Sequence, residues 1–408
     1  MRPRLFAALL LALTSTAMAE PATPGDLQIH GFGTLGLTRS TNREAGFVRD
    51  LSQPHGSRGE WRSDTDSLLG LQASWQLSPR MALIAQGVSR YHFGNSHDPQ
   101  LMSAFLRYEP DGPASLRLGR MPTDFYMYAD SRHVGYSLLT VRPSTDFFGL
   151  LPFSHLDGAD LQLSQPVGDS LLRGRLYWGA LNEQLPLASR RWRLEGSRLL
   201  GGNLGVQHGP WPIRLSSSVL RFGQDLPIPD VSNGLRQMAA LFPAAGEAAA
   251  RLAVAGSRSH FHSLGLVYDE GPLQFQAMLS RAEHASAAFQ NWEAGYLLLG
   301  YRRHQFTPFV GYSWIRSQAR TLTSGLPEGL SPALDRIQAG FSEVLADSGS
   351  DQNTTTLGVR WEIASQMALK FQLDRIRGKS RSLFPYRDET SRWNGRTDVF
   401  SIALDFIF

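Results

Sequence analysis

Residues 357–376, with the sequence LGVRWEIASQMALKFQLDRI, decide the fold because two short segments alternate strictly between apolar and polar side chains. One apolar row is Leu357, Val359, Trp361, Ile363, then Met367, Leu369, Phe371 and Leu373 after the connection. The polar row is Arg360, Glu362, Lys370, Gln372 and Asp374. Successive side chains of a strand point to opposite faces, so this stretch predicts an antiparallel hairpin with one apolar and one charged face.

The same two-faced pattern recurs elsewhere in the chain. Residues 171–180, LLRGRLYWGA, place Leu172, Leu176 and Trp178 opposite Arg173, Arg175 and Tyr177. Residues 398–408, DVFSIALDFIF, place Phe400, Ile402, Leu404, Phe406 and Phe408 opposite Ser401, Ala403 and Asp405. An unpaired charge in a dry core is costly, so we expect water on the charged face and hydrocarbon on the other.

Segments of this kind fill the chain from residue 28 to its end. We predict strands at 28–38, 66–77, 81–92, 100–109, 114–121, 155–165, 170–180, 198–207, 212–222, 259–269, 273–283, 289–301, 306–317, 354–363, 367–377 and 397–408. The even-to-odd connections are short and rich in turn-forming Pro, Gly and Asp, whereas the odd-to-even connections are mostly long. An even strand number with short turns at one end and long loops at the other is typical of a bacterial outer-membrane barrel.

The predicted fold is therefore all-β: a transmembrane antiparallel β-barrel of sixteen strands formed by residues 20–408. Only a closed barrel or a helix satisfies every backbone group in lipid. Four aromatic side chains, Trp75, Tyr108, Trp361 and Phe408, have the lipid-facing parity and lie within three residues of a short turn or of the chain end. We expect them to form the periplasmic aromatic girdle.

The first residues predict export. Arg2 and Arg4 precede an apolar run, and the small residues 17–19 form a cleavage site, so residues 1–19 are expected to be a signal peptide. No later stretch has the apolar length of a membrane-spanning helix. The formal net charge of +4 gives no reason to expect nucleic-acid binding, and the absence of cysteine excludes disulfides.

Motifs for catalysis or cofactor binding are weak. Gly31, Gly33 and Gly36 have the G-x-G-x-x-G spacing, but the polar run after them does not open a helix, so we interpret them as strand glycines. G-x-S-x-G and H-E-x-x-H are absent. The serine of VSNG (231–234) lies in a long connection, and His92 with His97 and His260 with His262 lack a third metal ligand. We predict no enzyme activity, no cofactor and no metal.

Three stretches resemble the Gram-negative outer-membrane porins: the terminal DVFSIALDFIF, the hairpin at 357–376, and ASLRLGRMP at 114–122. The resemblance implies a homotrimer in the outer membrane, surrounded by its lipid and lipopolysaccharide. It implies a terminal strand presented to the barrel assembly machinery. It also implies a third loop, here 122–154, that folds inward and narrows the pore.

That loop carries Asp124, Asp130, Asp146, Arg132, His133 and Arg142, and the predicted inner wall carries Arg107, Arg117, Arg173, Arg175, Arg360 and Lys370 against Glu109, Asp160, Glu362, Asp374 and Asp405. Selectivity depends on the charged groups at the narrowest point of a pore. We expect loop carboxylates to face wall arginines in a transverse field with mild anion preference. The alternative is that these charges only solvate a wide lumen.

Two inserts have helical patterns. Residues 331–347 have Ser331 as N-cap and Pro332 at the first helical position, and residues 234–256 are a weaker candidate interrupted by Pro243. They either pad the extracellular mouth or form a plug or lid. The predicted function is a water-filled channel for passive diffusion of small hydrophilic solutes and ions. The alternatives are a substrate-specific channel and a barrel whose loops serve adhesion or assembly.

Overall fold

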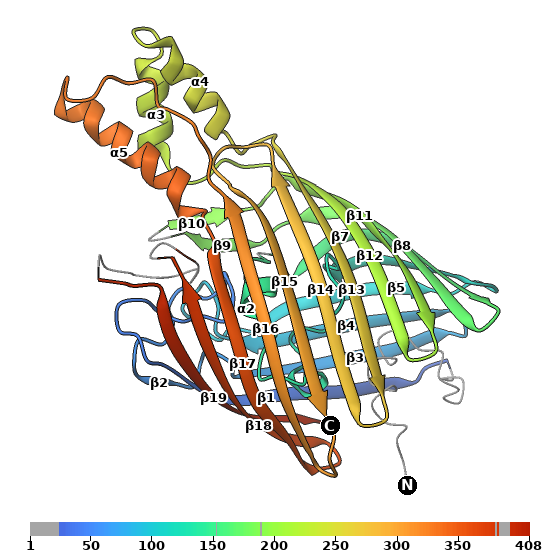
Figure 1. The fold of residues 1–408 in the computed structure, drawn as a ribbon. Helices are drawn as coiled ribbons and strands as arrows, with labels where there is room; N and C mark the ends of the chain where they lie inside the picture. Colours follow the sequence, from blue (N-terminus) through green and yellow to red (C-terminus); the bar gives the residue numbers. More distant parts are fainter. Residues whose placement is uncertain (1–23, 152, 188–189, 380–381, 383–391) are drawn as a thin grey trace.

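The protein is a closed antiparallel β-barrel of sixteen strands (Figure 1). The computed structural model describes residues 24–151, 153–187, 190–379, 382 and 392–408. The predicted signal peptide lies outside these residues. The barrel strands are β1 (Leu27–Ser40), β3 (Leu68–Ser78), β4 (Met81–Arg90), β5 (Gln100–Tyr108), β6 (Ala114–Pro122), β7 (His155–Val167), β8 (Ser170–Leu181), β11 (Ser197–His208), β12 (Trp211–Arg221), β13 (Arg258–Glu270), β14 (Leu273–His284), β15 (Asn291–Tyr301), β16 (Phe306–Gln318), β17 (Asp351–Ala364), β18 (Met367–Gly378) and β19 (Arg396–Ile407).

The first strand closes the barrel by pairing on both sides. Its first half, Leu27 to Thr34, pairs with β3, and Phe32 to Ser40 pair with β19. Every other barrel strand pairs with its two neighbours, so the sheet has no free edge. The predicted number and order of strands are confirmed.

Side-chain direction follows the sequence alternation. On β8, Leu176 and Trp178 are 59% and 56% exposed, whereas Tyr177 between them is 1% exposed. On β18, Phe371 is exposed and Lys370 and Gln372 are buried. The outward apolar side chains form the surface that a membrane would cover.

The glycines at 31 and 33 have a steric role in this closure. A Cβ atom on Gly31 would lie 2.0 Å from the ring of Phe408, and one on Gly33 would lie 2.4 Å from the ring of Phe406. The two rings are stacked with centroids 6.3 Å apart, so they cover the bare backbone of β1. These glycines serve strand pairing, which agrees with their interpretation as strand glycines.

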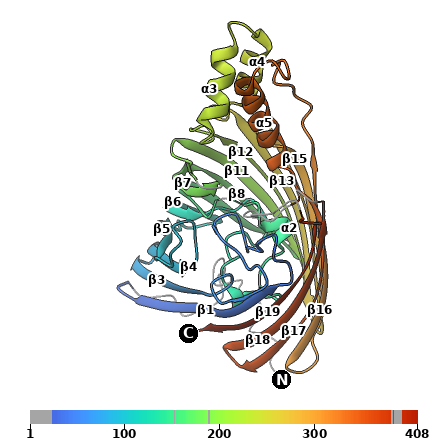
Figure 2. The same ribbon diagram turned by 90° about the vertical axis from the view of Figure 1, so that its left-hand side faces the viewer.

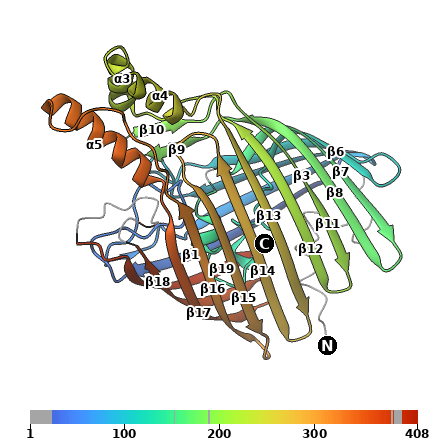
Figure 3. The ribbon, with the colours of Figure 1, turned by 45° about the horizontal axis from the view of Figure 1, so that its top comes forward.

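Short turns lie at one end of the barrel and long loops at the other (Figure 1). The long loops carry α3 (Pro229–Met238), α4 (Pro243–Leu252) and α5 (Pro332–Asp347), which extend beyond the rim (Figures 1 and 3). The segment predicted at 331–347 is α5, and its cap is the Ser331 side chain, which accepts a hydrogen bond from the Leu334 amide. The segment predicted at 234–256 is two helices, because Pro243 begins α4 instead of interrupting one helix.

Three short strands lie outside the prediction. β9 (Gln184–Leu187) and β10 (Arg190–Arg193) form a separate hairpin in the fourth long loop, and β2 (Trp61–Arg62) adds two residues beside β1. Helix α3 packs on both α4 and α5, and its Gly234 lies against Ile337 of α5. None of the helices in the described residues is long and apolar enough to cross a membrane.

The third loop, residues 123–154, lies inside the barrel, where its helix α2 (Thr145–Phe148) contacts β15, β16 and β17 (Figure 2). A single 3-10 turn, η1 (Gly135–Ser137), contacts β1 and β19. Most side chains of the loop are buried. The expectation of an inward-folded third loop is confirmed.

Candidate functional site: the third loop and the inner wall

The third loop is fastened to the barrel wall by Arg142, whose side chain is 2% exposed. Its guanidinium donates to both carboxylate oxygens of Asp66 at 2.8 and 2.6 Å and to Asp374 at 3.0 Å. It also donates to the hydroxyls of Thr38 and Ser401. One loop arginine therefore contacts β1, β18, β19 and the residue segment that precedes β3. Burial opposes the charge of this guanidinium, but Asp66 and Asp374 outweigh burial and raise the pKa of Arg142.

Two wall cations hold the backbone of the same part of the loop. Lys370 Nζ lies 2.8 Å from Asp405 Oδ2 and donates to the carbonyl oxygens of Gly135 and Thr140. Arg360 donates to the carbonyl oxygens of Tyr136 and Leu138 at 2.6 and 2.7 Å. Because carbonyl oxygens must find donors when they are buried, these contacts fix the path of the loop across the wall.

The beginning of the loop is held by the opposite part of the wall. Asp124, 4% exposed, forms ion pairs of 2.6 Å with Arg175 of β8 and with Arg214 of β12. Asn203 of β11 donates to the same carboxylate at 3.0 Å. The two arginines outweigh burial and lower the pKa of Asp124, so it is an anion at neutral pH.

Asp146, another carboxylate of the third loop, is held by neutral hydrogen-bond donors. Its oxygens accept hydrogen bonds from Ser313 of β16 and from Gln352 of β17, and it is 0% exposed. Burial raises the pKa of this carboxyl. Asp130 also has a raised pKa, because of burial and the nearby charge of Asp124.

Aromatic rings fill the space between the loop and strands β13 to β15. Phe147 of α2 contacts Tyr126 and Tyr296 edge-on with centroid distances of 4.9 and 5.2 Å, and Phe125 contacts Phe261 at 5.1 Å. Such pairs stabilise beyond their buried area. The loop is thus a packed element of the barrel core on this side.

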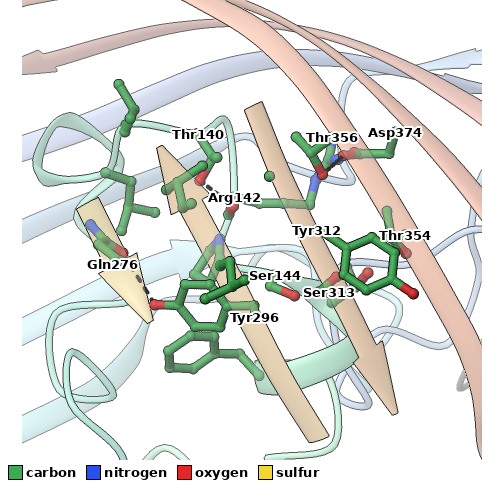
Figure 4. Close-up of a pocket in the computed structure, with 18 of the residues that line it drawn as sticks. Thr140, Arg142, Ser144, Gln276, Tyr296, Tyr312, Ser313, Thr354, Thr356 and Asp374 are labelled. Atoms are coloured by element: carbon green, nitrogen blue, oxygen red, sulfur yellow. Dashed lines mark hydrogen bonds and ion pairs between the residues drawn. The ribbon is translucent and has the colours of Figure 1, made fainter. Parts of the chain in front are cut away.

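A small cavity of about 60 Å³ remains between the loop and strands β14 to β18 (Figure 4). Arg142 and Asp374 lie at one side of it, and Tyr296 donates to Gln276 at 3.1 Å at the other. Thr140, Ser144, Ser313, Thr354 and Thr356 add hydroxyl groups to its lining. This volume is sufficient for a few water molecules.

Above the loop, a second cluster of charges joins it to the first long loop. Arg49 donates to the carbonyl of Arg132 at 2.8 Å, and Arg90 donates to Ser52 and lies 3.4 Å from Asp50. Burial raises the pKa of Asp50, but Arg90 and Arg132 outweigh it and lower the value to about 2. His133 is buried beside these arginines, and burial followed by their charge lowers its pKa well below the usual value.

The arginines that bind Asp160 on the remaining inner wall keep part of their surface open, while this carboxylate does not. Asp160 of β7 is 0% exposed at its side chain and pairs with Arg117 of β6 and Arg175 of β8, which are 13% and 8% exposed. Arg214 is 16% exposed. Arg107 lies 3.6 Å from the exposed Glu109, and Arg173 is half-buried with no ion pair among the described residues.

The predicted transverse field takes a different form from the one expected. Asp124 does face wall arginines, but Asp146 faces neutral groups, and Arg142 of the loop binds Asp374 of the wall and Asp66 of the segment before β3. The inward charges at 360, 370, 374 and 405 do not by themselves indicate water, because they are buried in ion pairs with one another or against the loop. Ion pairing and burial by the loop replace the solvation that the alternation indicated.

Sequence reasoning missed Arg214, Asp66 and Asn203. Arg214 and Asn203 lie on inward positions of β12 and β11, so the alternation that identified the other wall residues would also have identified them. Asp66 is the first residue of the strand predicted at 66–77 and has the inward parity there, although in the structure it lies two residues before β3. Trp75, Tyr108 and Phe408 are exposed near short turns or the chain end, and Trp361 is half-buried with its ring stacked on Phe306 at 5.5 Å.

The serine and histidines for which we predicted no catalytic or metal-binding role lie on α3, on β13 and in a loop. Ser232 of VSNG lies on α3. His262 points outward and its Nδ1 lies 3.1 Å from Ser217 Oγ, while His92 lies near the backbone carbonyl of Asp98. Among the residues that the structure describes, no group of three or more His, Cys, Asp or Glu could hold a metal ion.

Comparison with solved structures shows the same fold in outer-membrane proteins. An anion-selective porin from Comamonas acidovorans superposes with a TM-score of 0.53 at 11% identity, covering 94% of this chain and 100% of that chain. The trimer form of OmpT, an outer membrane protein of Vibrio cholerae, gives 0.52 at 10% identity with coverage of 94% and 100%. Its loop L8 deletion mutant gives 0.51 at 12% identity with coverage of 94% and 99%.

No family model matches the sequence, and no curated protein matches it. The chain therefore has the fold of outer-membrane β-barrels, while its sequence is far from those of the compared proteins.

Proposed function

We propose that this protein is an outer-membrane channel that lets small hydrophilic solutes and ions diffuse passively and that prefers anions. The fold supports the location, because a closed barrel with an outward apolar surface suits a lipid bilayer. By analogy with the trimeric form of the Vibrio OmpT barrel, the proposal includes assembly as a trimer. It includes no enzyme activity and no cofactor.

The observation that carries the anion preference is the unequal exposure of paired charges on the wall of β6, β8 and β12. Asp124 and Asp160 are at most 4% exposed, whereas Arg117, Arg175 and Arg214 all keep more surface than the carboxylates they bind. Arg173 adds a positive charge without an ion pair among the described residues. A passing ion therefore meets guanidinium groups with the carboxylates beneath them, and selectivity follows the charges that line the path.

The test is the reversal potential of the protein in a planar bilayer under a salt gradient. The unmodified protein is expected to give conducting steps and a potential of the sign that marks anions as the more permeant ions. Arg173→Gln combined with Arg107→Gln should shift that potential toward zero, because two positive charges leave the path. Arg375→Gln, an outward arginine on β18, is the matched control and should change nothing.

A second function, adhesion or assembly through the loops, is favoured by one observation. Leu241 and Leu330 are 73% and 65% exposed in the loops that carry α3, α4 and α5, beyond the rim. Exposed leucines that far from the apolar belt suit a contact with another protein. In a barrel of this kind no conducting steps are expected, and that outcome would overturn the channel.

A further inference from the structure

Three arginines lie side by side on the outer face of the barrel. The strand register places Arg198 of β11 directly opposite Arg221 of β12, and Arg221 directly opposite Arg258 of β13. All three side chains are exposed and point outward, since the alternate residues Ser197, Leu220 and Ser259 are buried. We call these three residues the arginine row.

The arginine row lacks the carboxylate partners that several other outward arginines have. Arg120 binds Asp157, Arg281 binds Glu283, and Arg375 binds Asp398, in each case within the outer face of the barrel. Among the residues that the structure describes, none of the row's guanidinium groups has an ion pair or a side-chain hydrogen bond partner. Like charges directly opposite on neighbouring strands destabilise a sheet, so the row needs a counter-charge from outside the chain.

The arginine row lies at the edge of the outward apolar surface that is nearer the long loops. Toward the short-turn end, each strand continues with exposed apolar residues, among them Leu204, Leu215 and Leu264. The apolar surface ends at Trp211, whose ring lies 4.6 Å from that of Tyr268. Ten residues of a tilted strand separate Trp211 from Arg221, which corresponds to about 25 Å along the membrane normal, the height of an outer-membrane apolar belt.

We propose that the arginine row is a binding site for the phosphate groups of an anionic glycolipid in the outer leaflet. The guanidinium group is always charged, and its planar fork matches phosphate oxygens with two parallel hydrogen bonds. Three such forks on adjacent strands, about 5 Å apart, offer a broad site for one or two phosphates. The apolar rows next to the site receive the acyl chains of the same lipid.

This level distinguishes a lipid from free phosphate as the source of the counter-charge. A soluble anion needs only the guanidinium groups, whereas a lipid headgroup also requires an apolar surface on the membrane side of the site. The row has that surface on the same three strands, through Leu200 of β11, Leu215 of β12 and Leu264 of β13. The inference depends on the outward face of the barrel alone and does not depend on conduction through its lumen.

The experiment uses the full mature protein in detergent and native mass spectrometry, with diphosphoryl lipid A as the probe. The unmodified protein should retain this lipid, and a dephosphorylated form of the same lipid should bind at least tenfold more weakly. Arg221→Gln, at the centre of the row, should lower the affinity at least fivefold, and the triple replacement by Gln should abolish retention. Arg375→Gln is the control, because it removes an exposed outward arginine that already has a carboxylate partner.

Each of three outcomes would contradict one part of the proposal. Equal losses in Arg221→Gln and Arg375→Gln would reduce the effect to general surface charge and overturn the site. Equal binding of the phosphorylated and dephosphorylated lipids would overturn recognition of phosphate. Displacement of the lipid by millimolar inorganic phosphate would assign the row to a free anion instead of a lipid. The variants are exposed substitutions, and their heat-dependent migration on gels checks that the barrel is folded.

Discussion

Lys370 of β18 and Asp405 of β19 form an ion pair of 2.8 Å with both side chains 0% exposed. The same ammonium group donates to two carbonyl oxygens of the third loop, and the same carboxylate accepts from Thr34 of β1. A single pair therefore joins the last strands, the first strand and the loop. It sits where the barrel closes.

Removing one partner of this pair should be costly. Lys370→Met leaves Asp405 as a buried charge without its cation, and we expect a loss of about 3–5 kcal/mol in the free energy of unfolding. Urea unfolding of the refolded barrel in detergent measures it. The double variant Lys370→Met with Asp405→Leu removes both charges and should recover most of the loss, and an equal loss in both variants would contradict the role assigned to the pair.

Arg142→Met should release the third loop. The change leaves Asp66 and Asp374 without their main cation, so the loop loses its strongest attachment to the wall. We expect faster cleavage of residues 123–154 by an added protease and, if the protein conducts, a larger single-channel conductance. Arg142→Lys keeps the charge but not the fork that binds Asp66 with two hydrogen bonds, and it should give an intermediate effect.

The attachment of the third loop should weaken in acid because of His133. Its folded-state pKa is depressed, whereas in a detached loop the imidazole returns to about 6.5. A detached loop thus binds more protons, so the histidine's contribution is intact above about pH 6.5 and falls by up to about 1.4 kcal/mol per pH unit below it. Protease cleavage of the loop should rise as the pH falls from 7.5 to 5.

Two other buried carboxyl groups of this region would not weaken the attachment of the loop over the same pH range. Asp50, with a pKa of about 2, stays ionised throughout that range, and the raised pKa of Asp146 favours attachment at low pH instead. His133→Gln should therefore remove the acid sensitivity. A variant that kept the same pH profile would show that another group causes it.

Gly33→Ala should impair closure of the barrel. The added Cβ atom would lie 2.4 Å from the ring of Phe406, so the ring must leave its position over β1. Overpacking of this kind costs about 1–3 kcal/mol, and we expect a lower yield of the folded species on gels. Gly174→Ala is the matched control on β8, because the nearest atom there is 3.6 Å away, and its yield should equal that of the unmodified protein.

Ser331→Ala should loosen α5 and leave the barrel unchanged. The serine side chain accepts from the Leu334 amide, and loss of an N-cap costs about 1 kcal/mol. Hydrogen exchange should become faster within residues 332–347 only. Ser342→Ala, an exposed position on the same helix, is expected to leave exchange unchanged or to slow it, since alanine has the higher helix propensity.

The barrel strands could be predicted closely because each of them must separate two environments. Along β17 and β18 the alternation from Leu357 to Asp374 fixes which side chains face outward, and a shift by one residue would turn every one of them to the wrong side. The ends of every predicted strand differ by at most three residues from the ends of the matching barrel strand. The hairpin of β9 and β10 was missed, because no membrane imposes a pattern on a loop.

The path of the third loop could not be predicted in the same way. Its position depends on contacts such as Arg142 with Asp66, which are far apart in the sequence and follow no period. Residue type indicated that Asp124 and Asp146 would contact the wall. A buried carboxylate can be satisfied by a pair of arginines, as Asp124 is, or by two neutral donors, as Asp146 is. The sequence alone does not distinguish between these two solutions.

The double pairing of β1 has a consequence for how the chain folds. Thr34 meets Asp405 across 371 positions of sequence, so the contact that completes the sheet cannot form before β19 has been synthesised. Until then both terminal strands present unpaired amides that can add to any other extended chain. Contacts of such long range are slow to form, and we therefore expect closure to limit the folding rate and the open sheet to be the species most prone to aggregate.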